Sequence, residues 1–302
     1  MSVTIIIPVY NRKDVVLRTL QSIPSSYPLI IVDNGSTDGS YELCRQWMLN
    51  DHRQNVRVER EFNRGAAAAR NKGLSLCTTE WVYFFDSDDV FTGLPKSWND
   101  SLDMVCFPVN MIVNGKKKVR DYSPVADPYV HVLNLMLGTH SMLFRTDWLK
   151  SIGGWNEKCM IWDDWELGLR SLINRPRLQW ITDTAYHQVY VKPDGLTGES
   201  FSKRFDEEMK VMSIMFDEIH DMEPGARRQK AMFALFLRCY IFSGQLLREG
   251  NEKASYYVVE FVYDKFRVNS MSYRLGSLIR WYVGKGGKRA WQFALKLVSL
   301  TS

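Results

Sequence analysis

Short apolar runs alternate with stretches of helical spacing along the first part of the chain. The run Val3–Val9 is rich in β-branched residues, which predicts a buried strand. Val16 and Leu20 then fall on one face of a helix that Asn11 is placed to cap. The same spacing predicts further elements at Leu29–Val32, through Leu43 and Trp47, at Val56–Val58, at Gly65–Leu76 and at Trp81–Phe85. This order predicts an α/β fold, with a mostly parallel sheet covered by helices.

The pattern changes after Asp89. Asn114-Gly115 is a strong turn signal between the apolar run Met104–Val113 and Lys117–Arg120, which predicts an antiparallel hairpin. Two helices and one strand follow, at Thr146–Ile152, Asp163–Ile173 and Tyr186–Val191. A loop rich in Pro, Gly and Ser then runs to Ser200, and almost everything after it has helical spacing. We therefore expect two domains, residues 1–200 and residues 201–302.

The charge of the chain is distributed unevenly. Its 302 residues carry a net charge of +5, but from Lys265 to the C-terminus there are eight basic residues and no acidic ones. Trp281, Trp291 and Phe293 are interleaved with them, a pattern typical of helices that lie on anionic membranes. The alternative is a helix pair docked on the core with its cations in water. No nucleic-acid binding motif accompanies the charge, so residues 265–302 predict a membrane surface or a docked pair and not a nucleic-acid partner.

The cysteines and the apolar segments bear on the compartment. Cys44, Cys77, Cys106, Cys159 and Cys239 are scattered without a C-x-x-C pair, which favours a reducing compartment over a disulfide framework or a zinc site. The N-terminus lacks the basic region of a signal peptide. No apolar stretch reaches the roughly 18 residues of a spanning helix. We expect a cytoplasmic protein whose membrane contact is peripheral.

Three carboxylates follow the predicted strand that ends at Phe85, in the sequence Asp86-Ser87-Asp88-Asp89. Ligands of open parallel sheets bind beyond the carboxyl ends of the strands. Carboxylates gathered there would repel one another unless a cation lay among them, and Mg²⁺ and Mn²⁺ take oxygen ligands and bridge them to phosphates. The alternative is a solvated turn that caps the next helix.

Other polar residues are predicted at the same edge of the sheet. Pro8 and Tyr10 end the first strand, and Asp33 ends the second, although Asp33-Asn34-Gly35 also has the composition of an ordinary turn. Arg64 and Arg70 flank a run of alanines and are able to reach a phosphate. The alternative for that run is a close-packed core helix with surface arginines.

Taken in order, these motifs resemble the family 2 glycosyltransferases of the GT-A fold over about the first two-thirds of the chain. The resemblance lies in Ile5–Asn11, Ile31–Asp38, Asn63–Gly65, Ala69–Asn71, Phe85–Asp89, Ile152–Trp155 and Trp162–Leu167. It implies a Rossmann-like, mostly parallel central sheet with a small antiparallel addition, followed by a helical C-terminal region. It also implies an inverting transfer of a sugar from a nucleoside-diphosphate sugar, with uridine as the favoured base, to a hydroxyl of a glycan or a lipid-linked acceptor.

The resemblance assigns roles to individual residues. Those implied to bind the nucleotide and the donor sugar are Pro8, Tyr10, Arg12, Asp33, Asn34, Arg64, Arg70, Asp86, Ser87 and Lys192. Asp88, with Asp86, is implied to bind Mn²⁺ or Mg²⁺, which would neutralise charge on the departing diphosphate. Asp164 matches the general base, with Asp163 and Glu166 as substitutes. Aspartates at a helix start also serve as caps, which is the alternative.

One segment departs from the family pattern. Many relatives have a histidine or arginine that meets the diphosphate or the metal where this chain has Val191–Gly195. Lys192 supplies positive charge there but cannot coordinate a metal while protonated. His187, beside a tyrosine, is more typical of an ordinary strand residue. The sequence therefore leaves the third metal ligand open.

Two other functions are compatible with these residues. A sugar nucleotidyltransferase also has a nucleotide-binding α/β edge and acidic metal ligands, but the Gly-rich N-terminal loop with a lysine that such enzymes favour is absent. A non-catalytic nucleotide-binding scaffold is the second, and the joint presence of Asp86, Asp88, Asp163 and Asp164 argues against it.

Overall fold

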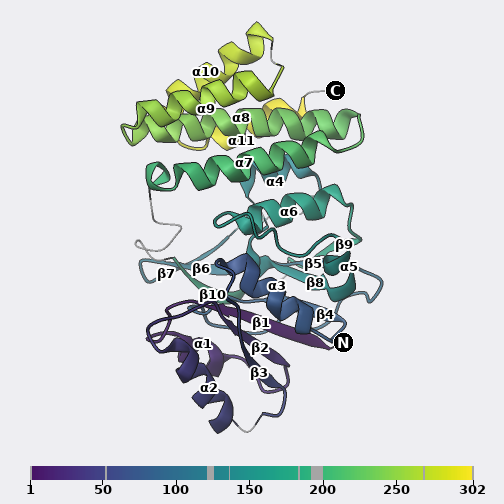
Figure 1. The fold of residues 1–302 in the computed structure, drawn as a ribbon. Coiled ribbons are helices and arrows are strands. Elements are labelled where there is room, and N and C mark those ends of the chain that lie inside the picture. The colour runs from purple at the N-terminus through teal and green to yellow at the C-terminus, as the bar shows by residue number, and fades with distance from the viewer. Residues whose placement is uncertain are drawn as a thin grey trace. The chain divides into compact units, whose positions relative to one another are not determined.

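Among the residues that the structure describes, seven strands form the main sheet, in the order β3-β2-β1-β4-β8-β5-β9 (Figure 1). Their bounds are β1 Val3–Val9, β2 Leu29–Asp33, β3 Val56–Arg60, β4 Trp81–Phe84, β5 Met104–Cys106, β8 Met142–Arg145 and β9 Leu178–Trp180. All neighbours in the sheet are parallel except β8, which is antiparallel to both β4 and β5. The predicted α/β fold with a mostly parallel sheet is confirmed.

The computed structural model describes residues 2–51, 53–120, 126–135, 137–182, 184–191, 200–267 and 269–300. These residues divide into two compact units. The first unit contains both sheets and comprises residues 1–124, 137–167 and 174–192. The second comprises residues 125–136, 168–173 and 193–302. The division into domains near residue 200 stays a prediction.

Helices of the first unit follow the predicted positions closely. They are α1 Val16–Ser22, α2 Ser40–Asn50, α3 Ala66–Leu76, α5 Thr146–Ser151 and the start of α6 Asp163–Ile173, whose second half falls in the other unit. Helix α3 packs on β1 and β2. A Cβ on Gly73 would come within 2.4 Å of the Ile6 side chain, so this glycine lets α3 lie close to the sheet. The predicted cap of α1 is wrong: the helix begins at Val16, and Asn11 instead accepts a hydrogen bond from the amide of Thr37.

The predicted hairpin is present, but the first of its predicted strands is divided. The chain leaves β5 at Cys106, and β6 Val109–Val113 belongs to a second sheet with β7 Lys116–Val119 and β10 Tyr186–Val191. Pro108 lies between β5 and β6, and a residue without an amide hydrogen cannot donate to a sheet ladder. Asn114 and Gly115 both have positive φ, 49° and 72°, as the β6–β7 turn requires. Strands β6 and β7 are antiparallel and form the small addition that was expected.

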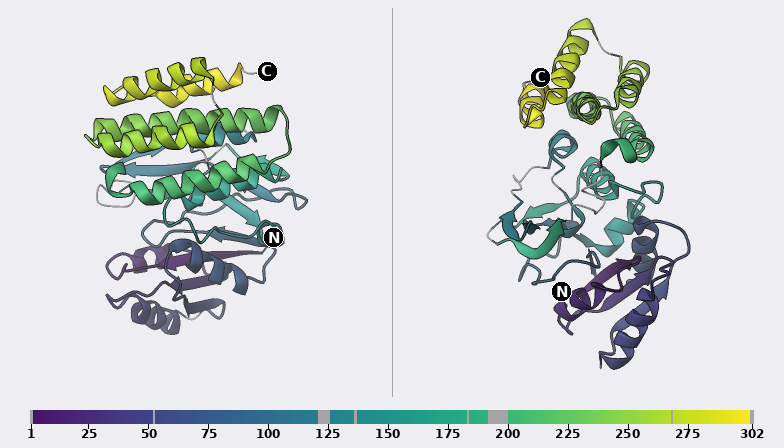
Figure 2. Two further views of the ribbon diagram at one scale, coloured as in Figure 1. Left: turned by 45° about the horizontal axis from the view of Figure 1, so that its top comes forward. Right: turned by 90° about the vertical axis from the view of Figure 1, so that its left-hand side faces the viewer.

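Helices make up almost all of the second unit (Figures 1 and 2). They are α4 Pro128–Asn134, α7 Phe205–His220, α8 Ala226–Arg248, α9 Glu252–Lys265, α10 Ser270–Gly284 and α11 Ala290–Ser299. Helix α8 is central, because α4, α7, α9, α10 and α11 all pack against it. The helices of the basic segment, α10 and α11, therefore bury one face on α8, while Trp281 and Phe293 stay half exposed.

Helix α8 corrects the expectation that no stretch of the chain is apolar enough to span a membrane. Its 23 residues pass that test by length and composition. However, 72% of its apolar window is buried inside the structure, where α8 serves as the core of the helical unit. A mostly buried core helix passes the same test, so this feature is weak support for a membrane span.

Candidate functional site

The ends of β1, β2 and β4, which carry candidate residues, lie at one edge of the main sheet. Val9 of β1 pairs with Asp33 of β2, and Ile6 of β1 pairs with Phe84 of β4, all in parallel register. Residues that follow these strands therefore emerge on the same side. Strand order reverses at β1, which lies between β2 and β4, and ligands of α/β sheets bind at such switch points.

Asp33 is buried at this edge, with 1% of its surface exposed. Its Oδ2 accepts hydrogen bonds from the amides of Gly35 and Ser36, each over 3.2 Å, and lies 3.7 Å from Nε of Arg60. Its Oδ1 has no hydrogen-bond partner among the described residues. Burying a carboxylate oxygen without a hydrogen-bond donor costs free energy. The unpaired oxygen therefore indicates a position at which a ligand donates a hydrogen bond.

Asn34 holds the neighbouring loop in place. Its Nδ2 donates to the carbonyls of Glu61 and Asn63, and its Oδ1 accepts from the amide of Gly65 over 2.8 Å. Asn34, which was predicted to be a turn residue, thus holds the segment before α3 in place through these hydrogen bonds. Arg64 of that segment is exposed.

Pro8, Tyr10 and Arg12 lie at the end of β1 and in the turn beyond it. Pro8 is buried within the strand, and Tyr10 is 54% exposed. Nε of Arg12 lies 3.6 Å from Oδ2 of Asp88, and the backbone amide of Arg12 donates to the hydroxyl of Ser40. The end of β1 thus presents a cationic side chain, Arg12, toward the loop that follows β4, and an exposed aromatic side chain, Tyr10.

Arg70 is the best connected residue of the edge. It is 4% exposed and lies over the ring of Trp155, 4.3 Å from its centre. Its Nη2 donates to Oδ1 of Asp86 over 2.9 Å, and its Nη1 donates to Oδ2 of Asp163. The expected contact of Arg70 with a phosphate stays a prediction, because in the structure two carboxylates occupy its guanidinium.

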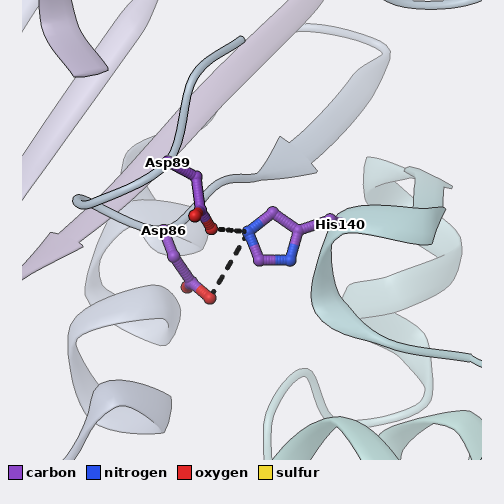
Figure 3. A group of neighbouring side chains, drawn as sticks. All are labelled: Asp86, Asp89 and His140. Atoms are coloured by element: carbon purple, nitrogen blue, oxygen red, sulfur yellow. Dashed lines mark ion pairs between the residues drawn. The ribbon is translucent and has the colours of Figure 1, made fainter. Parts of the chain in front are cut away.

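Asp86, Asp89 and His140 form a cluster whose ligand-type atoms all lie within 4.8 Å of one another (Figure 3). Nε2 of His140 lies 2.7 Å from Oδ2 of Asp89 and 3.5 Å from Oδ2 of Asp86. Two carboxylates and an imidazole suit several divalent cations. The cluster therefore fits a divalent metal ion.

The charges of this cluster depend on one another. Burial by itself would lower the pKa of His140, but Asp86 and Asp89 outweigh it and raise that pKa to about 9. Burial raises the pKa of Asp89, and His140 offsets only part of this effect. Burial would also raise the pKa of Asp86, but His140 and Arg70 hold it below its usual range. A metal ion at this position would displace the His140 proton.

The cluster differs from the metal ligands expected from the sequence. Asp86 belongs to it, whereas Asp88 faces Arg12, so the role of Asp88 stays a prediction. Ser87 is buried in the same loop. His140 was missed, because it lies in a short 3₁₀ turn, Thr139–Ser141, far along the chain from the acidic loop. Nothing in its local sequence signals that position.

The acidic start of α6 lies next to Arg70. Asp163 accepts from Arg70 with Oδ2 and from the amide of Asp164 with Oδ1, while Oδ2 of Asp164 accepts from the amide of Thr139 over 3.3 Å. Burial is the main reason that the pKa of Asp163 rises to about 6, against the opposing effect of Arg70. Glu166 is fully buried, and its role as a substitute base stays a prediction.

The two residues considered for the third ligand have different outcomes. His187 is fully buried in β10, 5.5 Å from Tyr83 and 4.9 Å from Phe91 between ring centres, as an ordinary strand residue. Burial, aided by the charge of His140, keeps the pKa of His187 well below its usual range. Lys192 lies outside the described residues.

Part of the chain is similar in sequence to known glycosyltransferases. Residues 4–99 match the model of Glycosyl transferase family 2. The Bacillus subtilis protein described as putative teichuronic acid biosynthesis glycosyltransferase TuaG is 43% identical over 91 residues, which cover 29% of this chain and 36% of that protein. Two other curated relatives are matched over 13% and 30% of their own lengths, so the chain spans about a third or less of the proteins it matches.

Solved structures resemble nearly the whole chain. S. aureus TarS 1-349 in complex with UDP-GlcNAc has a TM-score of 0.61 at 17% identity and is matched over 91% of this chain and 92% of its own. The mannosyltransferase PcManGT from Pyrobaculum calidifontis, in complex with GDP-Man and Mn²⁺, has a TM-score of 0.58 at 16% identity, over 99% and 86% of the two chains. At these identities the likeness shows the fold. Residues 4–99 of the chain therefore match glycosyl transferase family 2, and the chain has the GT-A fold of these structures.

Proposed function

We propose that the protein transfers a sugar from a uridine-diphosphate sugar to an acceptor hydroxyl. The observation that carries this proposal is the buried Oδ1 of Asp33, which has no hydrogen-bond partner among the described residues. Uracil presents one ring N–H between two carbonyls, and that N–H is a suitable donor to a single carboxylate oxygen. Guanine presents two adjacent donors, which a carboxylate pairs best with both oxygens. Oδ2 of Asp33 is already occupied by Gly35 and Ser36, which favours uracil.

The structural neighbours support a nucleotide-sugar donor in general. TarS was solved with UDP-GlcNAc, and the mannosyltransferase was solved with GDP-Man. The same fold therefore serves donors with either base, and the side chains at the end of β2 decide between them. Arg60, which lies beside Asp33 and 3.7 Å over the ring of Tyr41, would border the base.

A divalent cation would be held by Asp86 together with Asp89 and His140, or with Asp88 as the sequence predicts. The mannosyltransferase contains Mn²⁺, and a donor set of carboxylates and imidazole suits Mn²⁺ better than Mg²⁺. When bound, the ion would neutralise charge on the departing diphosphate. Arg12, 3.6 Å from Asp88, would add positive charge on the same side.

Inversion at the sugar carbon requires a base on the face opposite the leaving group. We assign this role to Asp164, because both oxygens of Asp163 are engaged by Arg70 and by the amide of Asp164. Asp163 then positions the start of α6, while Asp164 removes the proton of the acceptor hydroxyl. The burial of Glu166 leaves it a structural role.

The acceptor would be a hydroxyl of a cell-surface glycan or of a lipid-linked precursor at the cytoplasmic face of a membrane. TuaG is described as a putative glycosyltransferase of teichuronic acid biosynthesis, and teichuronic acid is one such polymer. Trp281 on α10, Phe293 on α11 and Leu300 just after α11 are exposed, among the basic residues of the segment 265–302. Aromatic and basic side chains together suit an anionic lipid surface.

Thermal unfolding tests the donor first. UDP and UDP-sugars with Mn²⁺ are expected to raise the melting temperature more than GDP, dTDP or their sugars, because a ligand of the folded state stabilises it by mass action. A larger shift with GDP than with UDP would contradict the assignment of the base.

Donor hydrolysis tests the chemistry. Release of UDP from the preferred donor should require Mn²⁺, stop on chelation with EDTA and be lost in Asp86→Ala, while the exposed Asp100→Ala keeps it. Asp88→Ala in the same assay distinguishes the two ligand sets. Full turnover after chelation would overturn the metal role, and release of pyrophosphate from UTP and a sugar phosphate would indicate a nucleotidyltransferase instead.

A further inference from the structure

The helical unit contains a cavity of about 540 Å³ that the sugar-transfer proposal does not use. It lies between α7, α8, the end of α9 and the start of α10. Its apolar lining consists of Phe216, Met232, Phe233, Phe236 and Phe266. The ring centre of Phe266 lies 5.0 Å from that of Phe216 and 5.9 Å from that of Phe236, so these aromatic side chains form one continuous wall. The volume is in the range of small-molecule sites.

The lining of the cavity is also positively charged. Arg228, Lys265 and Arg267 line it, together with His220, and no aspartate or glutamate does so among the described residues. Nζ of Lys265 lies 5.8 Å from the ring centre of Phe216, so the cations directly border the apolar wall. Lys265 and Arg267 are exposed and able to turn toward a ligand.

Two helix starts add to this positive potential. Gly225, Arg228 and Gln229 belong to the beginning of α8, and Asn269 and Ser272 belong to the beginning of α10. Neither helix has an acidic residue in its first turn. The N-terminus of a helix attracts anions through its free amides and its dipole. In α10 the amide of Ser272 already donates to Oδ1 of Asn269, so the start of α8 offers the freer amides. These helix starts and three permanent cations beside an apolar wall fit a ligand that is anionic at one end and apolar at the other.

We propose that this cavity binds one amphiphile with a phosphate head group, such as an alkyl or isoprenoid phosphate. The chain would lie against the wall of Phe216, Phe236 and Phe266, and the phosphate would pair with Arg228 and Lys265. A free phosphate would leave the aromatic wall uncovered, and a neutral lipid would leave the cations unpaired. The site lies within the helical unit, so its occupancy does not depend on whether the donor site of the other unit is active.

Titration calorimetry with the full chain and dodecyl phosphate, below its critical micelle concentration, tests the proposal. We expect one molecule bound per chain, at least about tenfold more tightly than dodecyltrimethylammonium, inorganic phosphate or UMP. Equal binding of inorganic phosphate or of UMP would overturn the proposal, because it would indicate a phosphate or nucleotide site. Equal binding of dodecyltrimethylammonium would overturn it by showing that the head-group charge has no effect.

A matched pair of double variants locates the site. Arg228→Gln with Lys265→Gln should weaken dodecyl phosphate binding about tenfold or more, while Lys285→Gln with Lys296→Gln, which removes the same charge elsewhere on the unit, should change it less than twofold. The replaced residues are at least partly exposed, so both proteins should keep their circular dichroism spectra and melting temperatures. Equal weakening in both pairs would show attraction to net charge only and would overturn the assignment to this cavity.

Discussion

Arg70 and Asp86 are joined by a hydrogen bond of 2.9 Å, although they belong to different motifs of the sequence. The same guanidinium binds Asp163, which lies in a third motif at the start of α6. Arg70 therefore fixes the distance between a carboxylate on the donor side of the site and the acidic pair that would hold the base. Asn71 acts in a similar way, because its side chain exchanges two hydrogen bonds with the backbone of Trp155. Motifs that are distant in sequence thus support each other directly.

Replacement of Arg70 by glutamine should reduce the free energy of unfolding by about 3 kcal/mol, because it leaves Asp163 and Asp86 without their shared cation in a largely buried setting. Urea denaturation measures the change. The exposed Arg64→Gln should stay within about 0.5 kcal/mol of the parent protein. Equal stability of the two variants would show that the Arg70 pairs contribute nothing to the fold.

Gly154→Ala should destabilise the protein by about 2 kcal/mol or more. Gly154 has a φ of 65°, and a Cβ there would lie 2.7 Å from Oδ1 of Asn71. This clash would disrupt the hydrogen bonds between Asn71 and the backbone of Trp155. Gly286→Ala is a matched control, since its φ is 87° but a Cβ would meet nothing within 4 Å. That control should cost only about 1 kcal/mol. A difference between the two variants isolates the steric clash in thermal or urea unfolding.

Asp33→Asn should weaken UDP binding about tenfold or more. The amide oxygen would stay with the amides of Gly35 and Ser36, so the NH₂ group would face the N–H of the base, donor against donor. Titration calorimetry in the presence of Mn²⁺ measures the affinity, and the exposed Asp100→Asn should retain it. An unchanged dissociation constant for UDP in Asp33→Asn would remove the basis for assigning uridine.

Asp164→Asn should lower kcat by roughly a hundredfold or more with little change in donor affinity, because general-base catalysis contributes on that scale. Asp163→Asn is expected to lower both kcat and stability, since it also removes a partner of Arg70. Glu166→Gln, at a fully buried position, should affect stability and leave the chemical step unaltered. A variant Asp164→Asn with parental kcat would exclude Asp164 as the base.

The rate should depend on pH through the acidic pair of α6. Burial raises the pKa of Asp163 to about 6, against the effect of Arg70. Protonation of Asp163 would weaken its ion pair with Arg70, which positions the start of α6, so kcat should fall as the pH drops through about 6 and level off above it. A profile of kcat at saturating donor from pH 5 to 8 measures this decrease, which Asp163→Asn should abolish. A rate independent of pH across this range would contradict the positioning role of Asp163.

Local patterns of the sequence determine most of the fold. The prediction gave the observed bounds for three elements, Val3–Val9, Asp163–Ile173 and Tyr186–Val191. Burial on one or both faces imposes a regular spacing of apolar residues, which is visible in the sequence. The split of Met104–Val113 into two sheets was missed, since an apolar run looks the same whichever sheet receives it.

The strand pattern already indicates which polar residues reach the edge of the main sheet, because the carboxyl ends of parallel strands lie together once the strand order is known. The partners of these residues are visible in the folded protein alone. Folding brought His140 to Asp89, turned Arg70 toward Asp86 and Asp163, and left Oδ1 of Asp33 without a donor among the described residues. Contacts between side chains so far apart in the sequence depend on how the helices and strands pack together. The local spacing of apolar and polar residues does not indicate that packing.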